Sequence, residues 1–188
     1  MFSPSTLPVL TTPRTCLALL APFQADLMAR FRCDNQEHLV TWEPRRTKEF
    51  YTEAFWQIQL RLALRDFRQG QSVSLAILNP EASEVLGVCN YSNIVRGTFQ
   101  SCHLGYALSH RWQGQGIMFE ALQASLAYIF NDLHLHRVMA NYLPHNQRSG
   151  DLLQRLGFKV EGRAEKLLMI NGRWEDHVLT SLINPADL

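Results

Sequence analysis

Hydrophobic positions along the chain repeat with two different periods, and the changes between them delimit the predicted elements. Alternating or continuous apolar runs, which are typical of strands, occupy seven segments: 15–20, 72–78, 85–94, 101–109, 136–143, 164–170 and 174–183. A spacing of three or four residues, which is typical of helices, occupies four others: 23–35, 47–69, 116–130 and 146–156. The order is therefore strand, two helices, three strands, helix, strand, helix and two strands.

Residues that begin or end helices support these boundaries. Thr47 is the expected cap of the second helix and Gly70 its end, after a loop that contains Pro44. Gly157 ends the last helix in the same way. The expected apolar stripe of the first helix is Phe23, Leu27, Met28 and Phe31, and that of the second is Phe50, Ala54, Ile58, Leu62 and Leu64.

The three consecutive strands between 72 and 109 predict an antiparallel meander, with turns at Asn79-Pro80 and Arg96-Gly97. Asn171-Gly172 predicts a tight hairpin between the last two strands. The strand–helix–strand succession from 101 to 143 is most simply a parallel crossover. The expected fold class is mixed α/β with a largely antiparallel sheet.

Composition restricts the class of protein further. The chain has 188 residues, enough for one domain over 1–188, with an irregular arm expected at 1–13. The net charge of +1 gives no support for a nucleic-acid or membrane partner, and no apolar run near the N-terminus is long enough to span a bilayer. Four scattered cysteines predict free thiols in a reducing cytoplasm, and no metal-ligand spacing is present, the histidines at 134, 136 and 145 included.

Two glycines stand where the strand at 101–109 gives way to a helix. Gly114 and Gly116 lie in the segment WQGQGIMFEAL, at 112–122. Glycine is useful there either for a tight turn or for letting a phosphate approach the backbone at a helix N-terminus, where N–H groups and the helix dipole attract anions. From glycine spacing alone, both interpretations remain open.

The residues around these glycines resemble a known family. Arg111-Trp112-Gln113-Gly114-Gln115-Gly116 is similar to the Q/R-x-x-G-x-G/A loop of the GNAT superfamily of N-acetyltransferases. Further similarity to the RimJ/RimL branch of ribosomal-protein N-acetyltransferases covers most of the chain: IMFEAL, WEP at 42–44, NYSNIVRG at 90–97, LGYALS at 104–109 and HRVMANYLPHNQRSGDLLQRLGF at 136–158.

The resemblance implies that acetyl-CoA is the co-substrate, bound beside a pair of strands that splay apart, here 101–109 and 136–143. Its pantetheine arm would bond the backbone near Leu108, and its pyrophosphate the amides of Gly114, Gly116 and Met118. The full set of implied cofactor-binding residues is Leu108, Arg111, Gln113, Gly114, Gln115, Gly116, Ile117, Met118, Asn146 and Ser149. Asn146 is also an ordinary helix cap, and both roles are compatible.

The resemblance leaves the proton-transfer groups incompletely assigned. Ser149 corresponds to the serine that acts as general acid in RimL-type enzymes. The tyrosine that many other relatives use as the acid falls on Leu153, and the glutamate base of the RimL-type enzymes falls on Leu168. Candidate bases are His103, whose side chain has a suitable chemistry, Glu165, and a water molecule. Glu43 would bind the substrate's ammonium group, and Tyr106 and Tyr142 would line the substrate cleft.

The implied reaction is acetyl transfer to the N-terminal alanine of a small-subunit ribosomal protein in the cytoplasm, with the ribosome or its assembly intermediates as further partners. An α-amine, with a pKa near 8, is neutral far more often at pH 7 than a lysine, with a pKa near 10.4, so it needs little help from a base. Two alternatives remain: acetylation of a small-molecule amine, and an acyl-CoA-binding module without turnover. No metal is expected.

Overall fold

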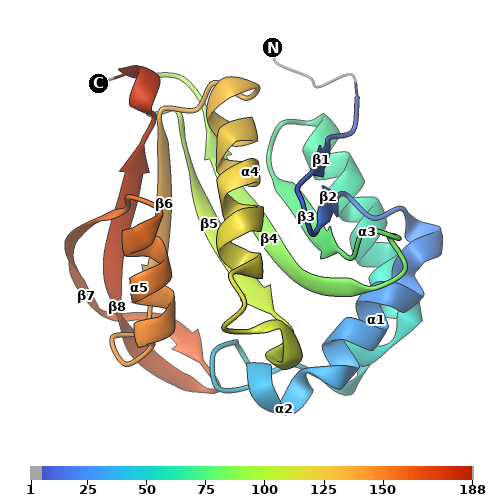
Figure 1. Ribbon diagram of the computed structural model, residues 1–188. Helices are drawn as coiled ribbons and strands as arrows, with labels where there is room; N and C mark the ends of the chain where they lie inside the picture. The colour runs from blue at the N-terminus through green and yellow to red at the C-terminus, as the bar shows by residue number, and fades with distance from the viewer. Residues whose placement is uncertain (1–5, 188) are drawn as a thin grey trace.

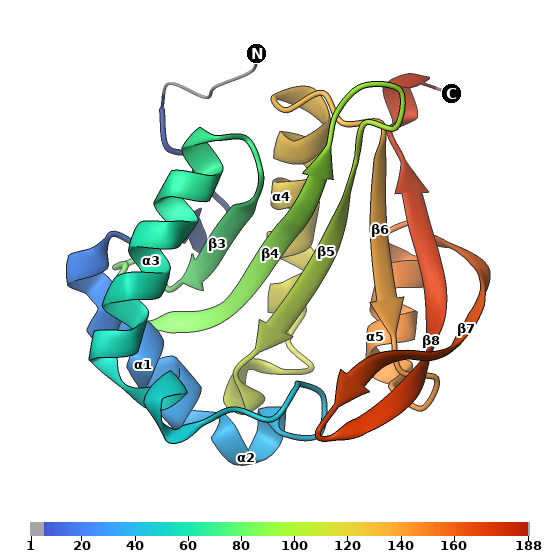
Figure 2. The same ribbon diagram turned by 180° about the vertical axis from the view of Figure 1, so that it is seen from behind.

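The computed structural model describes residues 6–187 of the chain. Its centre is one eight-stranded sheet in the order β1-β2-β3-β4-β5-β6-β8-β7. Helices α4 (Ile117–Asn131) and α5 (Gln147–Arg155) lie on one face of the sheet (Figure 1), and α1 (Ala25–Asp34) and α3 (Glu53–Arg68) lie on the other (Figure 2). The mixed α/β class and the largely antiparallel sheet are confirmed.

The strands are β1 (Val9–Thr11), β2 (Cys16–Ala18), β3 (Val73–Leu78), β4 (Val85–Val95), β5 (Ser101–Leu108), β6 (Arg137–Tyr142), β7 (Lys159–Ile170) and β8 (Arg173–Ile183). Every neighbouring pair is antiparallel except β5 and β6. The meander β3-β4-β5, the parallel crossover through α4 and the hairpin at Asn171-Gly172 are as predicted. Both hairpin residues have positive φ, 44° and 84°, as a two-residue turn of this kind requires.

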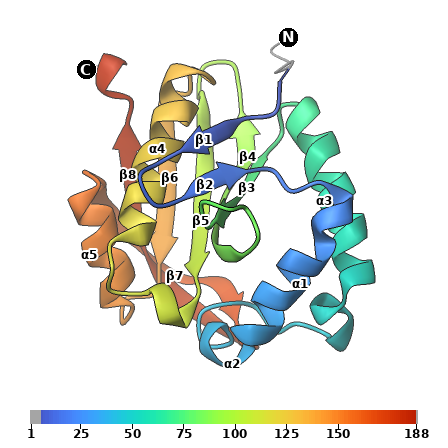
Figure 3. The ribbon, with the colours of Figure 1, turned by 45° about the vertical axis from the view of Figure 1, so that its right-hand side comes forward.

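Strand β1 corrects one expectation. Residues 9–11 were expected to be part of an irregular arm, but they pair with 16–18 as a short edge hairpin that lies against α4 (Figure 3). Residues 1–5 of that arm lie outside the described residues. Strand β7 is also longer than predicted, because it begins at Lys159 and contains an irregular stretch between Ala164 and Leu168.

The helices before β3 begin at other residues than predicted, and α3 buries a different face. Helix α3 is capped by Thr52, whose side chain accepts a hydrogen bond from the Phe55 N–H, and not by Thr47, which precedes a 3-10 turn at Lys48–Tyr51. Because this turn breaks the helical phase, the stripe counted from Phe50 is wrong: Ile58 is 54% exposed. The buried residues of α3 are Leu60 and Phe67. A short helix α2 (Gln36–Leu39) was not predicted, and Phe23 is exposed rather than part of the α1 face.

Two hydrophobic clusters hold the layers together. The larger one packs α4 against one face of β3–β6 and includes Leu75, Tyr91, Leu104, Leu122 and Val138. The smaller one packs α1 and α3 against the opposite face, with Phe31, Leu60 and Val88 among its members. Because successive strand residues point to opposite faces, these clusters identify the face of each neighbouring side chain. None of the helices within residues 6–187 is long and apolar enough to cross a membrane.

Candidate active site

A wedge-shaped gap opens between β5 and β6. The two strands pair only at three rungs, the last of which joins His103 and Met139. Beyond that rung, 104–108 of β5 and 140–142 of β6 diverge, so the sheet has two facing edges without a partner (Figure 2). The Ser109 N–H bonds the Leu86 carbonyl on β4, and peptide groups alternate along a strand, so those of Leu108 point into the gap. This is the splayed pair that the family resemblance implies, and its free edge fits an extended ligand.

The glycine loop lies at the wide end of this gap, where β5 leads into α4. Gly114 and Gly116 have φ values of 72° and 78°, which side chains other than glycine rarely adopt. A Cβ built on Gly114 would meet no atom within 4 Å, so the loop backbone faces open space. Gly116 caps α4 without a side-chain hydrogen bond, and the first-turn N–H groups have no partner inside the helix. Ile117 and Met118 occupy this turn with buried side chains.

The polar side chains of the loop bond to protein groups. Arg111 pairs with Glu84 and lies over the Trp112 ring, and the Gln115 amide donates to the Arg111 carbonyl. Gln113 connects two elements: its amide bonds Nε2 of His38, on α2, at 2.8 Å, and accepts from Arg148, on α5, at 2.7 Å. These side chains shape the loop and leave its backbone as the group available to an anion.

Arg14 and Glu120 hold the start of α4 against the β1–β2 turn, and sequence reasoning missed both. The Arg14 Nε donates to Glu120 at 2.7 Å, and its Nη1 donates to the Gln115 carbonyl at 2.8 Å. Thr12 donates to the same carboxylate at 2.6 Å. Burial by itself would raise the pKa of Glu120, but the hydrogen bonds from Thr12 and Arg14 outweigh it and the pKa is lowered. The carboxylate next to the loop is therefore charged and neutralised by Arg14.

Helix α5 brings Ser149 to the gap from the α4 side of the sheet. Asn146 caps this helix, because its side chain accepts from the Ser149 N–H at 3.2 Å. The Ser149 hydroxyl and the Tyr106 hydroxyl, on β5, are 2.6 Å apart. Burial raises the pKa of Tyr106 to about 12, although its bond to Ser149 opposes the shift, so the phenol keeps its proton at pH 7. Tyr142 packs on Gly150, where a Cβ would lie 3.0 Å from the ring.

His103 lies at the apex of the gap on the opposite face of the sheet. Its neighbours Cys102 and Leu104 belong to the α4 cluster, so the imidazole points to the α1–α3 side. It stands between Ser92 on β4 and Met139 on β6. Its Nδ1 is buried and has no hydrogen-bond partner among the described residues. An unpaired buried ring nitrogen is costly, which makes this atom a suitable contact for a bound ligand.

The Glu43 carboxylate lies against two arginines of the protein. Its carboxylate accepts from Arg32 at 2.9 Å, and Arg46 lies 3.7 Å away. Burial lowers the pKa of Arg32, while Glu43 opposes that shift. The Glu43 carbonyl also accepts from the Asn171 N–H at the β7–β8 turn. Glu43 therefore joins α1 to the hairpin, and this geometry does not favour the ammonium-binding role expected from the sequence.

The other residues considered as acids, bases or thiols lie in the core or on the surface of β7. Leu153 is buried in the core, and Leu168 is half exposed on β7, so neither position supplies a titratable group. Glu165 is exposed in the irregular stretch of β7. Burial raises the pKa values of the Cys89 and Cys102 thiols to about 12. Within residues 6–187, no three His, Cys, Asp or Glu side chains are grouped as metal ligands would be.

Comparisons with known proteins agree with this geometry. The family model of the GNAT acetyltransferase domain matches residues 17–159. The chain is 44% identical to the Escherichia coli K12 ribosomal protein uS5-alanine N-acetyltransferase, over 94% of this chain and 91% of that protein. The crystal structure of the ribosomal-protein-S5-alanine acetyltransferase from Vibrio fischeri superposes with a TM-score of 0.91, at 35% identity, covering 95% of this chain and 97% of that one.

A second solved structure contains a CoA compound. Mycobacterium smegmatis RimJ in complex with CoA-disulfide superposes with a TM-score of 0.87, at 27% identity, covering 98% of this chain and 90% of that one. The predicted fold and enzyme class are thereby confirmed. This chain belongs to the GNAT family of acetyltransferases.

Proposed function

We propose that this enzyme transfers the acetyl group of acetyl-CoA to the α-amine of an N-terminal alanine on a small-subunit ribosomal protein. The observation that carries the proposal is the match over 94% of the chain to a uS5-alanine N-acetyltransferase, combined with an intact glycine loop and gap. The E. coli ribosomal-protein-serine acetyltransferase is a weaker match, 29% identical over half of this chain. Alanine is therefore the favoured first residue of the substrate.

Residues on three elements would hold acetyl-CoA. Backbone amides of Gly114, Gly116 and Met118 would bind the pyrophosphate, supported by the α4 dipole. The peptide groups of Leu108 would bind the pantetheine arm as a neighbouring strand does. Asn146 and Ser149 would contact it from α5. Arg111, Gln113, Gln115 and Ile117 would act by fixing the loop, since the side chains of the first three bond to protein groups.

When bound, acetyl-CoA supplies an activated acetyl group as a thioester. The amine must arrive neutral, and an α-amine with a pKa near 8 is about 10% neutral at pH 7, against about 0.04% for a lysine. With leucines at 153 and 168, no carboxylate assists from those positions. His103 would accept the amine's proton through its unpaired Nδ1, directly or through one water.

The leaving thiolate would take a proton from the α5 side. The Ser149 hydroxyl is bonded to the Tyr106 hydroxyl, whose proton is retained at pH 7. A proton given up by Ser149 would be replaced from Tyr106 across this contact, and the phenolate would take a proton back from solvent water. Tyr142 would support this pair by packing the wall of the gap at Gly150.

The acceptor would be the N-terminus of a ribosomal protein, met in the cytoplasm either free or in an assembling ribosome. To test this, the enzyme is incubated with acetyl-CoA and Ala-starting peptides from small-subunit ribosomal proteins, each containing an internal lysine. Tandem mass spectrometry should locate the acetyl group on the α-amine, with the lysine unmodified. Acetyl on lysine, or faster acetylation of free polyamines, would refute the assignment. If the protein bound acetyl-CoA but acetylated no amine, the result would favour the alternative of an acyl-CoA-binding module without turnover.

A further inference from the structure

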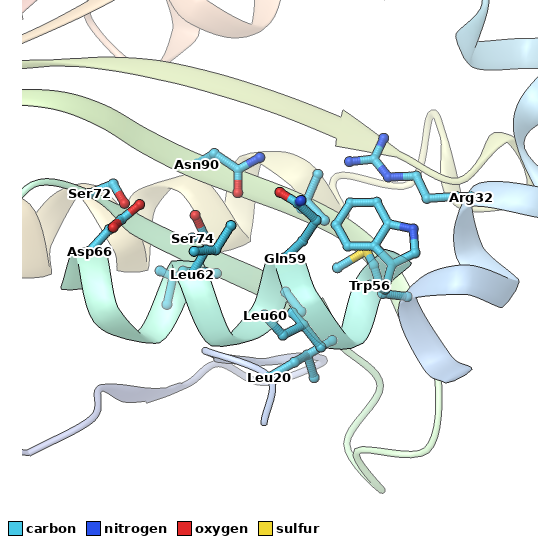
Figure 4. A pocket seen from close by; sticks show the side chains of 15 residues that line it. Leu20, Arg32, Trp56, Gln59, Leu60, Leu62, Asp66, Ser72, Ser74 and Asn90 are labelled. Atoms are coloured by element: carbon cyan, nitrogen blue, oxygen red, sulfur yellow. The ribbon is translucent and has the colours of Figure 1, made fainter. Parts of the chain in front are cut away.

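A cavity of about 260 Å³ lies between α3 and the sheet, outside the cofactor gap. Its walls come from α1, α3, β3 and β4, on the face to which His103 points. Figure 4 shows Gln59 and Asn90 directed into the same space, with Arg32 and Trp56 at one end and Asp66 at the other. Met28, Leu60 and Ala76 supply part of its apolar wall.

Several polar side chains of this cavity have no hydrogen-bond partner among the described residues. The side chains of Gln59, Ser72, Ser74 and Asn90 make no hydrogen bond to other described residues. Arg32 is buried, and although its Nη1 bonds Glu43, its Nε has no partner among the described residues. The Arg32 Nε is the group whose pairing with a ligand would gain most, because a buried donor without a partner is costly. The four other side chains are half-buried, so a ligand that bonds to them would replace water.

Gly105 lies between this cavity and the gap. It lies opposite Asn90 on the neighbouring strand, on the same face as His103, and in the part of β5 that borders the gap. A Cβ built on Gly105 would meet no atom within 4 Å, and the glycine is exposed. Open space therefore lies above β5 between Asn90 and the wedge.

We propose that this cavity binds the second and third residues of the acceptor peptide, whose chain crosses β5 over Gly105. The inference rests on the proposed function and adds where the acceptor lies. Strands in a sheet are about 4.8 Å apart, so the path from the gap to β3 spans about 10 Å, or roughly three extended residues. The amide side chains of Gln59 and Asn90 each offer a donor and an acceptor, as a peptide group requires.

The first test uses peptide length and wall variants. Alanine amide and Ala-starting peptides of two to five residues are compared, and kcat/KM should rise through the third residue and then level off. Gln59→Ala and Asn90→Ala should each raise KM for the tripeptide by roughly 3- to 10-fold, the effect of losing one hydrogen bond. Neither variant should change KM for alanine amide. Gln57→Ala is the matched control, because Gln57 lies on α3 outside the cavity and bonds Glu53.

The second test closes the path. Gly105→Val places a β-branched side chain, which suits a strand, into open space without requiring positive φ. It should lower kcat/KM for the tripeptide at least 10-fold and weaken its binding to the CoA-loaded enzyme in calorimetry, while binding of acetyl-CoA stays unchanged. Gly162→Val on β7 is the control, since that position also has open space and lies away from the gap.

The outcomes separate this inference from the proposed function. Equal kcat/KM for alanine amide and pentapeptide, or a Gly105→Val enzyme with unchanged tripeptide kinetics, would overturn the cavity as an acceptor site while leaving α-amine acetylation standing. Failure of wild-type enzyme to acetylate any α-amine would instead refute the proposed function.

Discussion

At the scale of single residues, the proposed function uses the adjacent hydroxyls of Ser149 and Tyr106, which are 2.6 Å apart, as a two-member chain for delivering a proton. We expect Ser149→Ala and Tyr106→Phe each to lower kcat by about 10- to 100-fold, the low end for a positioned proton donor, because a thiol is a good leaving group. The Kd for acetyl-CoA, measured by calorimetry, should change less than threefold.

The double variant distinguishes a chain from two separate contacts. If Tyr106 acts through Ser149, the double variant should be no slower than Ser149→Ala alone, since the two groups function as a unit. Additive losses in stopped-flow thiol-release assays would contradict the chain and leave Tyr106 as a packing residue.

Residues also show where sequence reasoning reached its limit. Gly114, Gly116, Asn146 and Ser149 could be found because a local motif places them, and the local backbone is as expected. Gly105 and Asn90 could not, because their relation depends on the β4–β5 register, which no pattern within either strand reveals. Arg14 was missed for the same reason: its partner Glu120 is 106 residues away in the sequence.

At the scale of elements, the contact of Thr12 and Arg14, in the β1–β2 turn, with Glu120 of α4 should depend on pH. The lowered pKa of Glu120 means that its charged form stabilises the fold above the ordinary carboxyl range and that this contribution is lost as pH falls through the folded-state pKa. We expect Glu120→Gln to lower the free energy of unfolding by about 1 kcal/mol at pH 7. The difference from wild type should narrow below about pH 4.3.

Urea denaturation at pH 7 and at successively lower pH measures this effect. Glu53→Gln is a suitable control, because Glu53 is an exposed first-turn glutamate of α3 that bonds Gln57 of the same helix. If the free energy of unfolding of Glu120→Gln stayed below that of wild type by the same amount down to pH 3, the charge of the Glu120 carboxylate would contribute nothing to this contact.

Element boundaries were predicted well where breakers are unambiguous and poorly where a short turn intervenes. The strands β3 to β6 and the helices α4 and α5 end within a few residues of prediction, because glycine, proline and asparagine delimit them. Helix α3 was assigned the wrong face because Phe50 belongs to the preceding 3-10 turn, so the helical count started out of phase. The irregular stretch in β7, with Lys166 at a φ of 46°, has no signal in its sequence.

At the scale of the whole molecule, ligand and fold should be coupled through the gap. Acetyl-CoA at 100 times its Kd should raise the free energy of unfolding by about 2.7 kcal/mol, or the Tm by roughly 5–10 °C. Hydrogen exchange should slow specifically at those peptide groups of 104–108 and 140–142 that face the gap, because they lack strand partners. Gly116→Val should abolish both effects, because its positive φ and the phosphate approach both require glycine.

The matched control for that experiment is Gly97→Val, which also replaces a glycine of positive φ, 75°, but in the β4–β5 turn. It should lower the Tm of the free protein yet keep the full acetyl-CoA shift. An unchanged shift in Gly116→Val, with native far-UV dichroism, would place the pyrophosphate elsewhere.

The divergence of β5 from β6 also limits which chains can pair with the sheet. Unpaired strand edges ordinarily recruit other polypeptides and lead to aggregation. Here the two edges are joined at His103 and Met139 and separate beyond that rung, so a straight strand inserted at the usual spacing could not follow both edges. The edges are also short, five residues on one side and three on the other. A slender, flexible chain can therefore enter the gap between β5 and β6. A strand of a second protein cannot pair with both edges, so the sheet cannot grow into a fibre at this place.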